Sequence, residues 1–295
     1  MNIAESQGIT LGMPYLVQSQ SINANSSAIS ADDVVSDALS IELSAAGVAT
    51  ARTISNQFIQ QKLSTLGFFS GPYDGDLTSS TSRKAITNFQ KVYGISASGT
   101  LNNITQTKLN KVYSTYSKIY STKALKTYVK NYRFDTEEVR NIARIAAFFK
   151  EGLNLDESQA AGFLGNIHQE SRFSPDNLQD GSLTTDHDSE YQFNATDGKA
   201  YGIVQWAFKT RKQLLQNSAN QLNLPVSDLN SQLYTIRIEM NGEFKGILAG
   251  LRDSGNEAEA AEIIFKSYES PNDASLSTRQ GYAKEILSIL KEAGI

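Results

Sequence analysis

Glu170 is the carboxyl group whose setting best suits catalysis, and it lies in the stretch from Ala160 to Pro175. Apolar residues precede it at helical spacing: Ala160, Phe163, Leu164 and Ile167. This spacing predicts a buried helix face, with Glu170 on the same side and Pro175 stopping the helix soon afterwards. Partial burial raises the pKa of a carboxyl group, so the position favours an acid that keeps its proton near neutral pH. Such an acid can protonate the leaving oxygen of a glycoside. The alternative interpretation is that Glu170 is an exposed glutamate at a solvated helix end.

A second stretch, Lys199-Ala-Tyr-Gly-Ile-Val-Gln-Trp206, is rich in β-branched and aromatic residues and follows Asp197-Gly198. This pattern predicts a turn and then a strand or hairpin. Tyr201 and Trp206 have flat apolar faces suited to stacking on sugar rings, and Gln205 carries an amide for N-acetyl or hydroxyl groups. Trp206 as an ordinary core residue is the alternative.

A helix ending in Glu-Ser, a polar loop and a Tyr-Gly-Ile-x-Gln strand together resemble the lysozyme superfamily. The chain resembles the phage tail-tip lysozyme family more closely, over about residues 139–290. The matching pieces are Ala160-Ala-Gly-Phe-Leu-Gly-Asn, Gln169-Glu-Ser, Tyr201-Gly-Ile-Val-Gln-Trp and Ser267-Tyr-Glu-Ser-Pro271. This resemblance implies a peptidoglycan hydrolase that cleaves the β-1,4 bond between N-acetylmuramic acid and N-acetylglucosamine. Its expected fold is mainly α, of the α+β lysozyme type with a small β-hairpin.

Glycoside hydrolysis normally needs a second carboxylate near the acid. In animal-type lysozymes this group comes just before the Tyr-Gly of the hairpin, a position that Ala200 occupies here. In the long acidic loop 174–198, Asp197 is the first candidate to replace it and Asp188 the second. If neither does, the chain resembles lytic transglycosylases, in which the 6-hydroxyl of the sugar attacks and an anhydro product forms. Glu269 is expected to be exposed, to pair with Arg279 or to support the site from behind.

Residues 55–112 are predicted to form a small domain of three helices joined by turns, one of which is Gly71-Pro-Tyr-Asp-Gly75. This segment resembles the type-1 peptidoglycan-binding domain over about residues 56–110. The matches are Leu63, Gly67, Phe68, Tyr73-Asp-Gly75, Thr81, Ala85, Phe89-Gln90, Gly94, Gly99 and Leu109. The resemblance implies that Tyr73, Asp74 and Phe89 serve wall binding, although Leu77-Thr-Ser replaces the Phe-Gly-Pro usual after the Asp-Gly turn. A helical spacer without a ligand is the alternative.

The remaining segments complete a four-part organisation. Residues 1–54 are predicted to be a flexible or partly helical arm, which could dock on a phage particle. Residues 113–134 are predicted to be a basic, Tyr-rich linker whose tyrosines rest on the neighbouring domain. Residues 135–295 are the predicted catalytic domain. Its later helices are expected near 209–221, 226–251, 257–268 and 277–290.

The composition narrows the function classes. The chain has no Cys, so a thiol nucleophile is excluded, and its net charge of -4 argues against nucleic acid as a partner. His168 and His187 lack the spacing of a helical zinc site, so we expect no metal and no cofactor, with His168 a hydrogen-bonded neighbour of the site. No apolar run is long enough to span a membrane. Residues 1–51 lack Lys and Arg, so we expect no secretory signal and a protein made in the bacterial cytoplasm.

Three functions remain open. The first is a lysozyme acting on peptidoglycan glycan strands as an endolysin or as part of a virion. The second is a lytic transglycosylase. The third is a non-catalytic protein that binds the wall or serves virion assembly.

Overall fold

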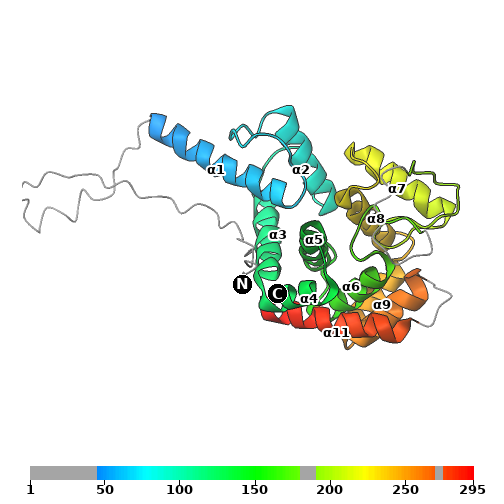
Figure 1. Cartoon of the computed structure of the whole chain (residues 1–295). Coiled ribbons are helices and arrows are strands. Elements are labelled where there is room, and N and C mark those ends of the chain that lie inside the picture. The colour runs from blue at the N-terminus through cyan, green and yellow to red at the C-terminus, as the bar shows by residue number, and fades with distance from the viewer. Residues whose placement is uncertain (1–44, 180–190, 270–274) are drawn as a thin grey trace, which may run out of the picture. The chain divides into compact units, whose positions relative to one another are not determined.

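Helices make up most of the computed structural model, which describes residues 45–179, 191–269 and 275–295 (Figure 1). Within these residues it has eleven α-helices and one π-helix. Their bounds are α1 Ala45–Thr65, α2 Ser80–Val92, α3 Asn103–Ser121, α4 Lys123–Tyr132, α5 Thr136–Gly152, α6 Glu157–Ser171, α7 Lys209–Leu222, α8 Leu229–Asn241, α9 Lys245–Asp253, α10 Glu257–Ile264, η1 Phe265–Glu269 and α11 Leu276–Ala293. The predicted mainly α fold is confirmed. Where a hairpin was expected, the structure has isolated β-bridges, which join Tyr201 to Leu178 and Tyr201 to Trp206.

Local sequence signals set the starts of the two helices that lead to the site. Asp135 and Asp156 form capping boxes before α5 and α6, in which each carboxylate accepts a backbone N–H of the first turn. The stripe that predicted α6 is buried, since Ala160, Phe163 and Ile167 are at most 1% exposed.

The first three helices pack around a core that includes Leu63, Phe89 and Leu109. Two buried glutamines fix the turns between them. The side-chain oxygen of Gln60 accepts the N–H of Gly75, and that of Gln90 accepts the N–H of Gly99. Both glycines have positive φ, a conformation that glycine adopts without steric cost.

Residues 113–134, predicted as a linker, are helical over most of their length. They form the second half of α3 and the whole of α4, and these helices pack on α5 and α11. Tyr116 and Tyr128 are buried, so the tyrosines rest on neighbouring helices as expected. The basic residues led to the prediction of a linker, but the apolar residues on the other face of α3 and α4 pack the segment against α5 and α11.

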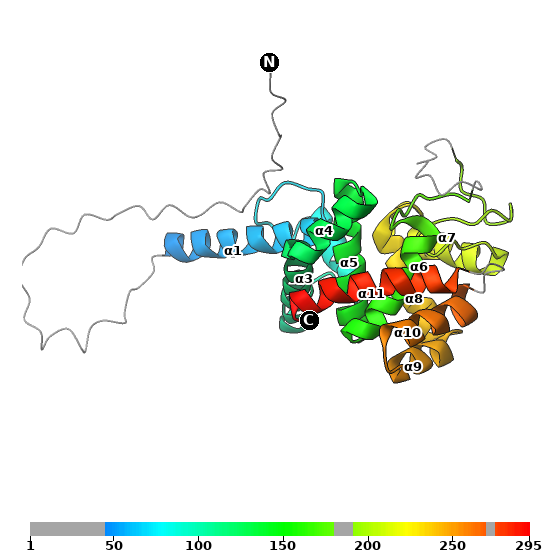
Figure 2. The same cartoon turned by 60° about the horizontal axis from the view of Figure 1, so that its bottom comes forward.

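The last helix, α11, joins distant parts of the chain. It packs on α6 and α10 near its start and on α3 and α4 near its end (Figures 1 and 2). There the two carboxylate oxygens of Glu292 accept the N–H groups of Lys123 and Ala124, which caps the start of α4. Close packing of α6 depends on glycine, because a Cβ at Gly165 would lie 2.5 Å from the carbonyl oxygen of Arg279.

Two predicted helices differ from those observed. The long helix expected over 226–251 is divided into α8 and α9 by a turn at Gly242. The helix expected to run to residue 268 ends as α10 at Ile264 and continues as the π-helix η1. In the described part of the chain, no helix has both the length and the apolarity to cross a bilayer.

Residues 48–295 form one compact unit. Within it, side chains of α2 reach the C-terminal end of α7. The last carbonyl groups of α7 accept hydrogen bonds from three side chains of α2, namely Lys84, Asn88 and Lys91. These donors satisfy backbone acceptors that have no partner within their own helix. The positive charges also complement the negative end of the α7 dipole.

Candidate active site

Glu170 is the second-last residue of α6, and the chain reverses directly after it. Arg172 and Phe173 both have positive φ and end the helix. The amide of Asn177 donates to the carbonyl oxygen of Glu170 at 3.2 Å, and the hydroxyl of Ser171 donates to the carbonyl oxygen of Ile203 at 3.0 Å. These bonds hold the end of α6 against the turn at 201–206.

The carboxylate of Glu170 forms an ion pair with Arg279 of α11. Oε1 of Glu170 lies 2.6 Å from Nη2 of Arg279, and the two side chains are 16% and 2% exposed. Arg279 is positioned by Asn166, whose Oδ1 accepts from Nη1 at 3.3 Å, and by the Phe265 ring, 5.1 Å from the guanidinium carbon. Glu170 is therefore held in place while part of its side chain reaches solvent.

A second carboxyl group, Glu269, lies within electrostatic reach of Glu170. Glu269 ends η1, and its Oε1 is buried without a hydrogen-bond partner among the described residues. Burial and the negative charge of Glu170 raise the pKa of Glu269 well above its usual range. Glu269 was expected to be exposed or paired with Arg279, but Arg279 pairs with Glu170 instead.

Behind this pair lies a buried network centred on Glu239 of α8. Its carboxylate accepts two hydrogen bonds from Arg211 of α7, at 2.7 and 3.2 Å, and a short one from the hydroxyl of Tyr268. The indole N–H of Trp206 lies 3.2 Å from both carboxylate oxygens. The network fixes Tyr268, and therefore the backbone that carries Glu269.

Burial is the largest cause of the raised pKa of Glu269, and charge balance adds to it. Three carboxyl groups, Glu170, Glu239 and Glu269, share their surroundings with two guanidinium groups, Arg211 and Arg279. With all groups ionised the cluster would carry one net negative charge away from bulk water. A proton on Glu269 removes that charge, so the cluster retains one proton at a pH where an isolated glutamate would lose it.

The turn beside Glu170 corrects two of the sequence interpretations. Trp206 is 0% exposed and Tyr201 is also buried, so neither offers a free face for stacking on a sugar. The two residues exchange backbone hydrogen bonds of 3.1 and 2.9 Å, which close the turn and turn both rings inward. Gln205 is partly exposed, but its amide donates to the carbonyl oxygens of Asn177 and Gly202 and serves the turn itself.

Two known family profiles match the chain. The sequence profile of phage tail lysozyme matches residues 140–290, which is just over half of the chain. The chain belongs to the phage tail lysozyme family. A peptidoglycan-binding domain profile matches residues 57–109, and the two matches together support a lytic enzyme of the cell wall. No curated protein and no solved structure gives a significant match.

Within this phage tail lysozyme, Asp197 is engaged by a lysine. Its Oδ1 lies 2.5 Å from Nζ of Lys212, which is 0% exposed, and its Oδ2 accepts from the hydroxyl of Tyr191 at 2.6 Å. Burial opposes ionisation, but the hydrogen bonds from Lys212 and Tyr191 outweigh it and lower the pKa of Asp197 to about 2. No contact among the described residues joins Asp197 to Glu170. The other candidate, Asp188, lies outside the described residues.

His168 is the hydrogen-bonded neighbour that the sequence suggested. Its Nδ1 lies 2.5 Å from the hydroxyl of Tyr128, and the ring of Tyr282 stacks on it at 3.7 Å between centroids. Burial, with a smaller effect from Arg172, lowers the pKa of His168 to about 3, so the ring is neutral at physiological pH. In residues 45–179, 191–269 and 275–295, no three His, Asp or Glu side chains converge to hold a metal ion.

The three residues expected to bind the wall occupy different surroundings. Phe89 is fully buried in the core of the N-terminal helices and cannot touch a ligand. Tyr73 is exposed, and its ring lies near that of Phe69. Asp74 is exposed but accepts hydrogen bonds from Gln60 and Asp76, which lower its pKa and hold its turn. Of the three, Tyr73 keeps a surface that a wall polymer can reach.

Proposed function

We propose that the chain cleaves the β-1,4 bond between N-acetylmuramic acid and N-acetylglucosamine in peptidoglycan, with Glu170 as the proton donor. The observation that supports this proposal is a second carboxyl group, Glu269, within electrostatic reach of Glu170 and with a raised pKa. Glycoside cleavage near neutral pH needs a carboxyl group that still holds its proton.

Glu269 can supply a proton close to Glu170, because burial and the charge of Glu170 raise the pKa of Glu269. Glu170 has 16% of its side chain exposed, whereas Oε1 of Glu269 is buried. Glu170 is therefore the member that can contact a glycosidic oxygen and deliver the proton. Once Glu170 holds the proton, Glu269 is the carboxylate left to stabilise positive charge on the sugar or to activate water.

A lytic transglycosylase is the second candidate, and the surroundings of Asp197 favour it. Asp197 is held by Lys212 and so is not free to act as a second carboxylate. If Glu269 keeps its proton throughout, Glu170 alone would act first as acid and then as base, and the 6-hydroxyl of the sugar would replace water. The anhydro product would identify this route.

Loss of turbidity of purified peptidoglycan tests the proposal. Wild type, Glu170→Gln and Glu269→Gln are compared with Glu243→Gln, a control that removes an exposed carboxylate between α8 and α9. We expect Glu170→Gln to lose lysis and Glu243→Gln to keep it. Equal lysis by Glu170→Gln and wild type would refute the assigned donor, and no lysis by any protein would favour a non-catalytic role. Mass spectrometry of the released muropeptides then separates reducing ends from anhydro ends.

We also propose that the chain reaches the wall by one of two routes. The arm that would dock on a phage particle lies almost entirely in residues 1–44, outside the described part of the chain. Action at the wall after release by lysis, or as part of a virion, fits the family.

A further inference from the structure

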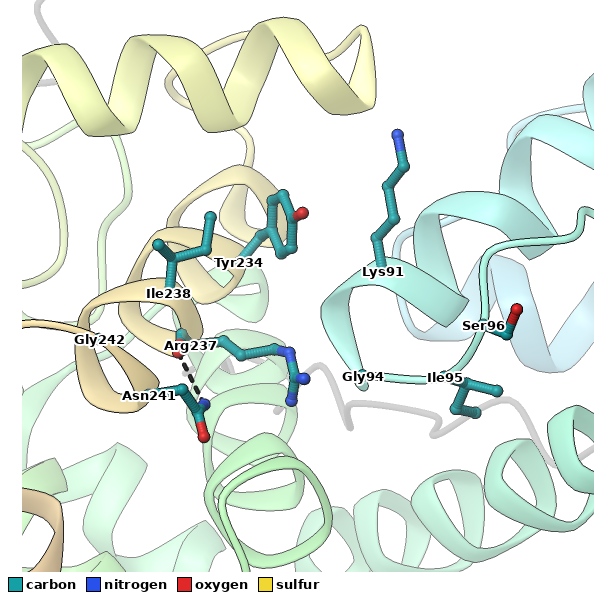
Figure 3. Close-up of a pocket in the computed structure, with 9 residues that line it drawn as sticks. All are labelled: Lys91, Gly94, Ile95, Ser96, Tyr234, Arg237, Ile238, Asn241 and Gly242. Atoms are coloured by element: carbon teal, nitrogen blue, oxygen red, sulfur yellow. Dashed lines mark hydrogen bonds between the residues drawn. The ribbon is translucent and has the colours of Figure 1, made fainter. Parts of the chain in front are cut away.

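A cavity of about 540 Å³ lies between the end of α2 and the outer part of α8 (Figure 3). It therefore joins the residues that match the peptidoglycan-binding profile to those that match the lysozyme profile. Ile95 and Ile238 contribute apolar walls, and Tyr234 contributes an aromatic ring. Lys91 and Arg237 supply the charge, and no Asp or Glu lines the cavity. The site described above uses none of these residues.

Arg237 carries a positive charge that no carboxylate among the described residues balances. Its side chain is half-buried, and burial lowers the pKa of its guanidinium. Across the described residues, its guanidinium has no carboxylate within ion-pair distance and donates no hydrogen bond. By contrast, Arg211 of the neighbouring helix α7 binds both oxygens of Glu239. A guanidinium that is partly removed from water without a counter-charge favours the binding of an anion.

The backbone makes room for this guanidinium at Gly94. A Cβ at Gly94 would lie 2.1 Å from Nη2 of Arg237, so only glycine permits the observed position. Gly94 also has a φ of +68°, which strains other residues. In Figure 3, Arg237 extends from α8 across the cavity toward Gly94. The planar fork of donors therefore lies at the boundary between the two matched segments.

The charged groups around Arg237 add to its positive potential. Nζ of Lys91 donates one hydrogen bond to the carbonyl oxygen of Gln221, at 2.7 Å, and Lys91 lines the same cavity. Lys108 lies close enough for Arg237 to lower its pKa, although burial is the larger cause. The nearby carboxylate of Glu151 is already bound by Lys111 at 3.2 Å and by Thr115 at 3.0 Å.

We propose that this cavity binds an oxyanion of a wall polymer, and that the ligand is the terminal carboxylate of a peptidoglycan stem peptide. The planar guanidinium of Arg237 matches a carboxylate through two parallel hydrogen bonds. The isoleucines and Tyr234 suit the short apolar side chains of such a peptide. The peptide assignment rests on the proposed action on peptidoglycan, whereas the anion site rests only on the cavity. A phosphate of an anionic wall polymer has the same charge chemistry and is the competing source.

Isothermal titration calorimetry of the full chain tests this proposal with three defined probes. They are diacetyl-L-Lys-D-Ala-D-Ala, the same tripeptide with its carboxylate converted to an amide, and a short poly(glycerol phosphate). We expect the free tripeptide to bind and the amide to bind about tenfold more weakly or worse, since a charge-assisted pair is lost. Arg237→Gln should weaken tripeptide binding by a similar factor. Arg52→Gln, which removes an exposed arginine of α1, is the matched control and should bind as the wild type does.

A thermal melt of Arg237→Gln separates binding from a structural role. Because the guanidinium has no partner among the described residues, its loss should leave Tm unchanged or raise it. A clear fall in Tm would mark Arg237 as structural and would overturn the proposal. Binding of none of the probes, or binding that does not depend on Arg237, would also overturn it.

Two further outcomes are informative. Poly(glycerol phosphate) binding that depends on Arg237, without tripeptide binding, would confirm the anion site and overturn its assignment to the stem peptide. Glu170→Gln should bind the tripeptide as the wild type does, because Glu170 is not among the cavity residues. A chain that binds the tripeptide but cleaves no glycan would therefore refute the proposed function and leave the cavity assignment intact.

Discussion

Substitution of Asp197 by Asn distinguishes a structural carboxylate from a catalytic one. The change keeps the shape of the side chain and removes its charge beside Lys212, which is 0% exposed. Two neutral acceptors remain for the ammonium group: the carbonyl oxygen of Lys199 at 2.9 Å and the hydroxyl of Tyr191 at 3.2 Å. The structure therefore predicts a loss of stability rather than a loss of chemistry.

The size of this effect follows from burial. Removing one partner of a fully buried ion pair costs about 3–5 kcal/mol. The side chain of Asp197 is 17% exposed, which admits screening by water, so we expect about 2–3 kcal/mol here. At about 2–4 °C per kcal/mol for a chain of this size, Tm should fall by about 4–12 °C.

The pH dependence gives an independent check. The folded pKa of Asp197, about 2, lies below its ordinary value of 3.8. Its carboxylate therefore stabilises the fold fully above about pH 4, and this contribution is lost as the pH falls toward about 2. The difference in stability between wild type and Asp197→Asn should shrink over that window.

Calorimetric melts at neutral and acidic pH, together with lysis per folded molecule, form the assay. Asp197→Asn combined with Lys212→Met should be more stable than Asp197→Asn alone, because the unpaired buried charge is gone. A wild-type Tm together with abolished lysis would refute this reasoning and restore Asp197 as a catalytic residue.

Three further predictions concern the site and its support. Glu269→Gln should be at least as stable as wild type near pH 8. The stability that comes from the raised pKa of Glu269 is complete below about pH 4.5 and is lost as the pH rises toward the folded pKa, at about 1.4 kcal/mol per pKa unit. Urea unfolding of both proteins near pH 5 and near pH 8 measures this, and an equal pH dependence of the two would contradict it. Asn88→Ala should cost about 1–2 kcal/mol in urea unfolding, since it leaves a buried carbonyl oxygen at the end of α7 without its donor; no change would show that water replaces the donor. Gly165→Ala should lower the free energy of unfolding by about 1–3 kcal/mol and reduce lysis, because the new Cβ displaces the backbone of Arg279. The matched control is Gly281→Ala, whose Cβ would have no atom within 4 Å, and it should keep both lysis and the fold.

The sequence could predict those parts of the fold that local signals decide. The helix that carries Glu170 has an apolar stripe and a capping aspartate, and both act within a few residues along the chain. The extent of helix in residues 113–134 was harder to predict, because the basic residues lie on the outer face of α3 and α4 and carry no information about the inner face. The helix predicted over 226–251 is divided at Gly242, whose backbone leaves the helical conformation, and the apolar spacing alone did not show this break.

The site was predictable only in part, because its second carboxyl group comes from far along the chain. Glu269 lies 99 positions after Glu170, and the packing of α10 and α11 on α6 brings the two together. The available signal was the Tyr-Glu-Ser-Pro stretch, which resembles the family but does not show which way the glutamate faces. Trp206 was misassigned because an aromatic residue in a short turn has no period that distinguishes core from surface.

The π-helical turn makes the angle of the second carboxyl group tolerant of chain length at one place only. Residues of an α-helix are about 100° apart around the axis, and a π-turn accommodates one additional residue within the helix. Deleting one residue from within Phe265–Glu269 would therefore restore regular α-helical spacing and leave the terminal glutamate near its present angle. Among relatives, a gap of one position in this turn would be compatible with the same pair of carboxyl groups, provided that the glutamate itself is kept.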